Sequence, residues 1–176
     1  MNEIIKKNGI NFGVITGVIS IIITGTIYLV NIELFTAWWL GLVSISIYLA
    51  IGIYLLLKTR KELGGVFSFK QAFTTYFISA VIGITISVLF NILLFNFIDP
   101  SLKDTVQELT IESAVSMMKK FGTPSSEIKK AVEKMGETNQ FETLSQLKGM
   151  AFSILFSAIF GLILAAIFKS KPKEQY

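Results

Sequence analysis

The chain has 176 residues, of which 52% are hydrophobic and only 16% are charged. A typical soluble domain has roughly 25% charged residues, so this composition argues against a soluble globular protein. The chain has no Cys and no His, which excludes disulfides, thiolate chemistry and histidine-based acid–base catalysis. The net charge is +4, and because the basic residues cluster beside apolar runs, we expect no nucleic-acid partner.

Four runs without Asp, Glu, Lys or Arg predict four transmembrane helices. They cover residues 8–32, 34–57, 71–98 and 149–168, and about 20 residues suffice for a helix to cross the hydrocarbon core of a bilayer. We therefore expect an all-α fold with one membrane domain over residues 1–176. It is an integral membrane four-helix bundle with spans at about 9–31, 37–57, 70–98 and 149–168. Residues 99–148 then form a helical extracytoplasmic insert between the third and fourth helices.

The first run has a second interpretation, a cleaved signal peptide, because Lys6 and Lys7 precede it. Its apolar region is longer than the usual roughly 7–15 residues, and no small-residue cleavage site comes before Glu33. We favour a helix that is retained in the protein.

The positions of the basic residues predict the orientation in the membrane, since Lys and Arg in short loops and tails favour the cytoplasm. The two tails and the second loop hold nine of them, whereas the first loop holds none. The nine are Lys6, Lys7, Lys58, Arg60, Lys61, Lys70, Lys169, Lys171 and Lys173. The insert has seven Lys and eight acidic residues, and long segments cross the membrane with less regard to charge. We expect both termini in the cytoplasm and the insert outside.

Small residues recur every four positions in three of the runs, and this spacing lets helix backbones approach closely in lipid. The stripes contain Gly9, Gly13 and Gly17, then Ser79, Gly83 and Ser87, and finally Ser153, Ser157 and Gly161. We interpret them as helix-packing faces, so that Gly83→Leu should destabilise the bundle and Ile82→Leu should have little effect. The alternative is that the hydroxyl groups line a path for a solute.

Asn91 and Asn96 are the most polar groups at membrane depth. Hydrogen bonding between helices is the simpler interpretation, worth about 0.6 kcal/mol on average, and contact with a ligand is the alternative. Asp99 and Pro100 then end the third helix, because the residue before Pro avoids helical geometry. No Asp, Glu, Lys or Arg lies within a span, which argues against an ion-coupled transporter or a pump.

The stretch from Lys58 to Phe73 predicts a cytoplasmic turn and a helix start. Gly64 and Gly65 permit the chain to reverse. Ser68 and Gln71 have the spacing of a capping box, which predicts that the third helix begins at Phe69. The proposed topology anchor consists of Lys58, Arg60, Lys61, Ser68 and Gln71.

The insert predicts two amphipathic helices. Ser101 with Asp104 is a candidate cap for the first, and Thr123 before Pro124 is a candidate cap for the second. The apolar side of the first comprises Leu102, Val106, Leu109, Met117 and Phe121, and that of the second Ile128, Ala131, Val132 and Met135. These faces can pack on each other and on the bundle, lie in the lipid headgroups, or bind a partner.

Four segments together resemble one known family. They are KNGINFGVITG at residues 7–17, WW at 38–39, GGVFSFKQAF at 64–73 and NILLFNFIDP at 91–100. On these segments the chain resembles the bacterial membrane-protein family known as domain of unknown function 4199. The resemblance implies a small four-helix membrane protein, found chiefly in the Bacteroidota, and brings no activity or catalytic residues.

No catalytic, cofactor-binding or metal-binding motif is present in the sequence, so we expect no enzyme and no cofactor. The expected function is that of a non-enzymatic accessory or scaffold protein of the bacterial cytoplasmic (inner) membrane. Its partners would be the lipid bilayer and a membrane or envelope protein that binds residues 101–148, and a homo-oligomer is compatible with the stripes. The alternative is a passive carrier or channel for a small neutral solute or lipid.

Overall fold

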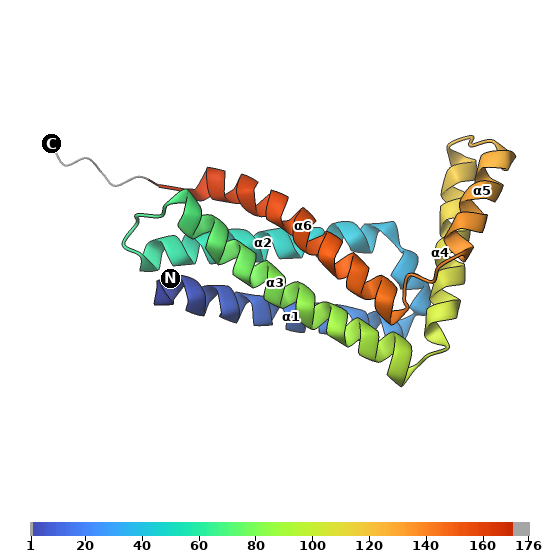
Figure 1. Ribbon diagram of the computed structural model, residues 1–176, viewed down its shortest axis with the longest axis horizontal. Helices are drawn as coiled ribbons and strands as arrows, with labels where there is room; N and C mark the ends of the chain where they lie inside the picture. The colour runs from blue at the N-terminus through green and yellow to red at the C-terminus, as the bar shows by residue number, and fades with distance from the viewer. Residues whose placement is uncertain (1, 171–176) are drawn as a thin grey trace.

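The computed structural model describes residues 2–170 as a helical bundle with a helical hairpin across one end (Figure 1). In chain order the elements are α1 (Glu3–Val30), the 3-10 helix η1 (Ile32–Thr36), α2 (Trp38–Glu62), α3 (Phe69–Leu93), the π-helical turn η2 (Leu94–Ile98), α4 (Leu102–Lys120), α5 (Ser125–Gly136) and α6 (Thr143–Phe168). Four helices are long and apolar enough to cross a membrane: α1, α2, α6, and α3 continued through η2. The predicted all-α membrane-type bundle is confirmed.

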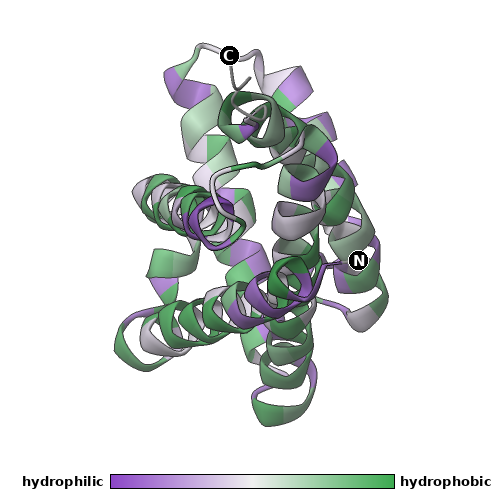
Figure 2. Ribbon diagram, turned by 90° about the vertical axis from the view of Figure 1, so that its left-hand side faces the viewer, coloured by the Kyte–Doolittle hydropathy of each residue, from purple (hydrophilic) through white to green (hydrophobic). Residues whose placement is uncertain are grey.

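The two ends of the bundle differ in character. The start of α1, the α2–α3 turn and the end of α6 lie at one end (Figure 1), which we call the basic end. Its described basic residues are Lys6, Lys7, Lys58, Arg60, Lys61, Lys70 and Lys169, whereas Lys171 and Lys173 lie outside the described residues. The other end, the insert end, carries η1 and the α4–α5 hairpin. Figure 2 looks from the basic end and shows apolar residues over the spanning helices, as a lipid environment requires.

α1 and α3 pack closely along a seam of α1 glycines against α3 isoleucines. A Cβ added at Gly9, Gly13 or Gly17 would lie 2.9, 2.7 or 2.6 Å from Ile78, Ile82 or Ile86, respectively. Gly83 of α3 meets Thr16 of α1 in the same way, at 3.1 Å. The glycines therefore permit a backbone approach that a larger residue would prevent.

Ile82 belongs to this seam, because its Cβ and Cγ2 cover Gly13. The sequence suggested that Ile82→Leu would have little effect. Because the structure gives the β-branched side chain a specific packing partner, we now expect this substitution to weaken the α1–α3 contact.

The basic end is held by a buried apolar cluster that joins α2, α3 and α6. It consists of Leu56, Phe67, Ala72, Leu164 and Ala165. The Phe67 and Ser170 backbones form an isolated antiparallel bridge in which Ser170 N donates to Phe67 O at 2.7 Å. The Ser170 hydroxyl also donates to Gly65 O at 2.6 Å. The end of α6 is thereby fixed to the α2–α3 turn.

The start of α3 has the predicted capping box. Gln71 N donates to the Ser68 hydroxyl at 3.2 Å, and Ser68 N donates to Gln71 Oε1 at 2.8 Å. α3 begins at Phe69, as the sequence predicts. Gly64 and Gly65 precede it with φ angles of +73° and +89°, a conformation that residues with a side chain rarely adopt.

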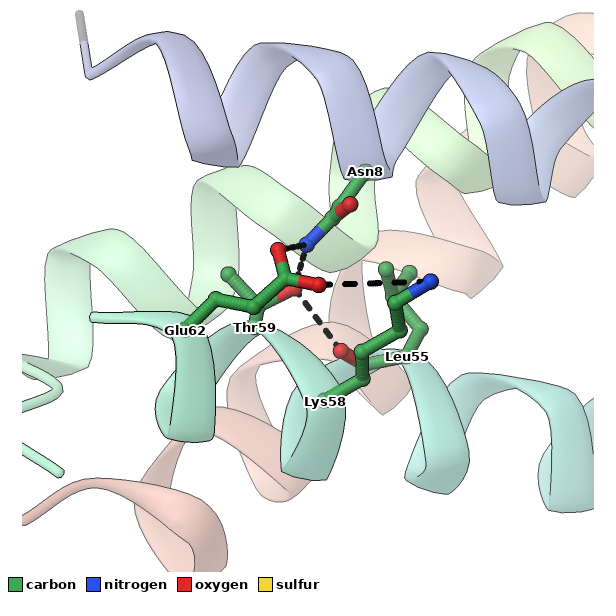
Figure 3. Close-up of polar contacts among 5 residues, drawn as sticks. All are labelled: Asn8, Leu55, Lys58, Thr59 and Glu62. Atoms are coloured by element: carbon green, nitrogen blue, oxygen red, sulfur yellow. Dashed lines mark hydrogen bonds and ion pairs between the residues drawn. The ribbon is translucent and has the colours of Figure 1, made fainter. Parts of the chain in front are cut away.

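A buried polar cluster joins α1 to α2 near the basic end (Figure 3). Asn8 is only 3% exposed, and its amide donates to the Thr59 hydroxyl at 3.2 Å and to Glu62 Oε2 at 2.7 Å. Lys58 Nζ lies 4.0 Å from Glu62 Oε1 and 5.4 Å from the centre of the Phe12 ring. Lys58 therefore also holds α2 against α1, whereas Arg60 is half-buried and Lys61 is exposed.

The insert end has its own apolar cluster, formed by Leu94, Phe95, Leu102 and Val106. It fixes the first half of α4 to the end of α3, and Phe141 packs its ring on that of Phe95 with a centroid distance of 4.5 Å. The insert is thus docked on the bundle at its base.

Two helix caps in the insert differ from the prediction. Ser101 makes no capping bond through its side chain; Asp99 Oδ1 instead accepts from Leu102 N at 3.3 Å and from the Ser101 hydroxyl at 2.6 Å. Thr123 does not cap α5, which begins at Ser125 after Pro124. Pro124 occupies the N-cap position instead, and Thr123 completes the end of α4, where its N donates to Met118 O at 3.0 Å.

Asp99, which lies outside the spans, has a shifted pKa. The hydrogen bond from the Ser101 hydroxyl, supported by Leu102 N–H and the Tyr28 hydroxyl, holds the pKa of Asp99 below its ordinary value. The Tyr28 hydroxyl donates to Asp99 Oδ2 at 3.3 Å, which connects the end of α1 to the start of the insert.

Candidate functional site

α2, α3 and α6 converge around Tyr76 of α3. The Tyr76 ring lies between Gly52 of α2 and Gly161 of α6, and a Cβ added at either glycine would lie 2.9 Å from a ring carbon. Neither helix has another glycine in close contact on the insert side: nothing lies within 4 Å of an added Cβ at Gly41 or Gly149. Gly41 and Gly149 both border open space near the insert end, so α2 and α6 are closely packed around Tyr76 and leave a space between them toward the insert end.

Two cavities occupy the space between these helices. The inner cavity has a volume of about 590 Å³ and lies between α2 and α6 over the α1–α3 seam. The outer cavity, of about 780 Å³, extends to the insert end, where α4 covers it. Both are bordered by Ser20, Tyr48, Val88, Asn91 and Ser153. Because the cavities share these residues, they form one continuous space, which we call the α2–α6 cleft.

The cleft has a polar floor and apolar walls. The floor residues Thr16, Ser20, Ser79, Ser87 and Asn91 come from α1 and α3, and Ser153 and Ser157 add hydroxyls from α6. The walls include Ile45 and Leu49 of α2 and Phe152, Phe156 and Phe160 of α6. None of the described lining residues is charged. This is an amphipathic space at membrane depth without an ionic group.

The two asparagines of α3 differ in their surroundings. The Asn96 amide donates to Ile92 O at 3.2 Å and to Phe141 O at 3.1 Å, so it holds α3 to the segment before α6. Asn91 borders both cavities, and the structure records no hydrogen bond from its side chain to another residue in the range 2–170. Asn96 is therefore engaged within the protein, whereas the amide of Asn91 is open to the cleft.

The three stripes of small residues have different positions in the structure. Gly9, Gly13, Gly17 and Gly83 lie in the α1–α3 seam, and Gly161 packs on Tyr76. Ser79 and Ser87 lie where the seam meets the cleft, and Ser153 and Ser157 line the α6 side of it. The structure thus brings Ser87, Asn91 and Ser153 together around one space.

Sequence reasoning did not select four residues of the site. Tyr48 and Ser20 border both cavities, and Tyr76 and Gly52 close the inner one. The one signal that the sequence offers is that Ser20 and the two tyrosines are polar residues within apolar runs. This signal is not enough, because a pattern along one helix does not reveal which helix lies opposite.

Comparison with known proteins identifies a family but no activity. The family described as "Protein of unknown function (DUF4199)" matches residues 11–170. No curated protein and no solved structure matches the chain. Because the match covers most of α1, the other three spans and the insert, the chain belongs to this family of proteins of unknown function.

Proposed function

We propose that the protein binds one lipid-like molecule with an uncharged, hydrogen-bonding head in the α2–α6 cleft. The observation that carries the proposal is the polar floor at membrane depth between apolar walls, with Asn91 open to both cavities. In hydrocarbon a polar side chain without a partner is costly. A ligand with hydroxyl or amide groups would satisfy Asn91, Ser87 and Ser153.

The absence of charged residues from the described lining favours a neutral head. A phosphate or carboxylate in the cleft would be buried without a counter-charge, and this costs more than burial of a hydroxyl group. Each cavity lies in the range of about 300–1,000 Å³ that ligand pockets occupy. The acyl chain would lie along Phe152, Phe156 and Phe160.

The same chemistry supports a passive role. Ion-coupled transporters and pumps use ionisable residues within the membrane, and none of the described cleft residues is an acid or a base of that kind. We therefore propose binding, or passive carriage, of a neutral lipid rather than coupled transport.

Photocrosslinking tests the proposal directly. The full-length protein in nanodiscs is exposed to a monoacylglycerol that carries a diazirine in its acyl chain, and the adducts are mapped by mass spectrometry. We expect adducts at Phe152 and Phe156, which line the cleft. Competing lipids should suppress the labelling according to the charge of their head group. Unlabelled monoacylglycerol should suppress it, and a charged fatty acid should suppress it much less.

A matched pair of variants separates the cleft from general contact with lipid. Ser153→Phe places a ring in both cavities, whereas Ala151→Phe adds the same ring to an exposed α6 position that does not line them. We expect loss of most cleft adducts in the first variant only. Equal labelling of all lipid-facing residues, unchanged by Ser153→Phe, would refute the proposal.

A second candidate function is the accessory or scaffold role, with the hairpin as its binding surface. The feature that favours it is the position of α5, which lies on the side of α4 away from the bundle (Figure 1) and exposes Lys129, Lys130 and Glu133. Crosslinking in native membranes, with and without charge reversal at Lys129 and Lys130, tests this role. An unchanged set of crosslinked proteins would argue against it.

We further propose that the protein lies in a bacterial cytoplasmic membrane with the basic end in the cytoplasm. Seven described Lys and Arg residues at that end support this orientation, because basic residues in short loops favour the cytoplasm. A homo-oligomer is also proposed, with the exposed apolar faces of the spans as contacts.

A further inference from the structure

One side of α4 faces the bundle from Leu102 as far as Met117. Leu102 and Val106 are buried against the end of α3, and Thr110, Ser113 and Met117 border the outer cavity. Residues three or four positions apart lie on the same side of a helix. Phe121 follows Met117 by four positions and therefore continues this side to the tip of the hairpin.

The continued side leaves the bundle before the helix ends. Met117 is 48% exposed and Phe121 is 83% exposed. Figure 1 shows that the hairpin lies crosswise to the spans, that its tip projects past the ends of α2 and α6, and that α5 lies on the far side of α4. No protein among the described residues covers Phe121, and the space on that side of the tip is where the bilayer around the spans must lie.

Two Trp residues indicate where the membrane interface lies at this end of the bundle. α2 begins at Trp38 and Trp39 at the same end of the bundle, and both side chains are exposed. Exposed Trp residues at a helix end mark the headgroup region. Lys119 and Lys120 immediately precede Phe121 and are exposed, so their ammonium groups can reach lipid phosphates while the ring enters the apolar layer.

We propose that the tip of the α4–α5 hairpin inserts into the lipid interface at the insert end, with Phe121 in the acyl region and Met117 at its border. The bilayer is the occupant, because the side that carries these residues is continuous with the side that docks on the membrane-spanning bundle. The hairpin thus has two opposite sides, with α4 toward the lipid and α5 toward the aqueous phase.

Spin labelling tests this inference in the full-length protein, since the natural chain has no Cys. Single labels at Phe121→Cys and Lys130→Cys are compared in nanodiscs of phosphatidylcholine and phosphatidylglycerol, with oxygen and a water-soluble nickel chelate as relaxation agents. We expect the label at 121 to be more accessible to oxygen and the label at 130 to be more accessible to the chelate.

Two outcomes would overturn the inference. Equal access of the chelate to both labels would show that the tip stands in water. Shielding of the label at 121 from both agents, together with dipolar coupling between copies, would show a protein contact in place of lipid. If Phe121→Cys does not fold, a single label at Met117→Cys reports the same side of α4, and greater accessibility of that label to the chelate than to oxygen would equally overturn the inference.

Discussion

The hydroxyl oxygens of Ser20 in α1 and Ser87 in α3 lie 2.6 Å apart and form a hydrogen bond where the seam opens into the cleft. On the basic side of this pair, Gly9, Gly13 and Gly17 contact α3. On the insert side, a Cβ added at Gly25 would meet nothing within 4 Å. The hydrogen bond therefore marks the point where the glycine seam of α1 ends and the cleft begins.

The seam predicts opposite effects for the same substitution at two glycines of α1. Gly13→Ala should lower the free energy of unfolding by about 1–3 kcal/mol, because the added methyl group overlaps Ile82 and the Ser79 carbonyl and overpacking costs about that much. Gly25→Ala should be neutral or stabilising by up to about 1 kcal/mol through helix propensity. Unfolding in mixed micelles, followed by circular dichroism, measures both. Equal losses at the two positions would contradict the seam.

The two asparagines predict a separation of binding from stability. Asn91→Leu should weaken monoacylglycerol binding by about 2- to 10-fold, the value of one hydrogen bond, with little change in Tm. Asn96→Leu should lower Tm, because the carbonyls of Ile92 and Phe141 lose their shared donor. Competition photolabelling and thermal unfolding of both variants provide the measurements. A large loss of Tm in Asn91→Leu with normal binding would reverse the assignment of the two roles.

The cap at Asp99 predicts a pH dependence. Its pKa is below the ordinary value of 3.8, so its contribution to stability is complete above that pH and is lost as the pH falls through the lower, folded-state pKa. The difference in Tm between wild type and Asp99→Asn should stay constant from neutral pH to about pH 4 and shrink in more acidic buffer. A difference that grows on acidification would mean that the carboxylate opposes folding.

The orientation predicts labelling from opposite sides of the membrane. Ser125→Cys lies in the hairpin and Lys169→Cys lies at the basic end, and both positions are exposed. In intact cells an impermeant maleimide should label only the first, and permeabilisation should reveal the second. Ser170 is unsuitable for this purpose, because its hydroxyl bonds to Phe67 N and Gly65 O. Labelling of both sites in intact cells would rule out the proposed topology.

The four spans and the start of α3 follow from local rules, and so they were predictable. An uncharged run is long enough to cross a bilayer whatever its neighbours are, and the Ser68–Gln71 capping box is complete within four residues. Which helix packs against each stripe of small residues depends instead on how the helices are arranged in three dimensions. The spacing of Gly9, Gly13 and Gly17 predicts close packing of α1, but it does not say that α3 rather than α2 lies opposite.

The cleft was not predictable for the same reason. Ser153, Ser157 and Gly161 form one regular stripe in the sequence, yet Gly161 packs on Tyr76 and Ser153 borders an open space. A stripe along one helix does not reveal what lies opposite each of its members. The cap of α4 was mistaken for a related reason, since the π-helical turn before it places Asp99, and not Ser101, where the carboxylate can accept from Leu102 N.

The position of Tyr76 between Gly52 and Gly161 has a mechanical consequence. The α1–α3 seam, the Asn8 cluster and the buried residues around Phe67 make the basic half a rigid frame. The other ends of α2 and α6 are held as well, because Phe35 before α2 and Phe141 before α6 pack on Phe95 at the insert end. The α2–α6 cleft is therefore bounded by packed side chains at both ends, and a change in its width would have to move one of these two contact regions.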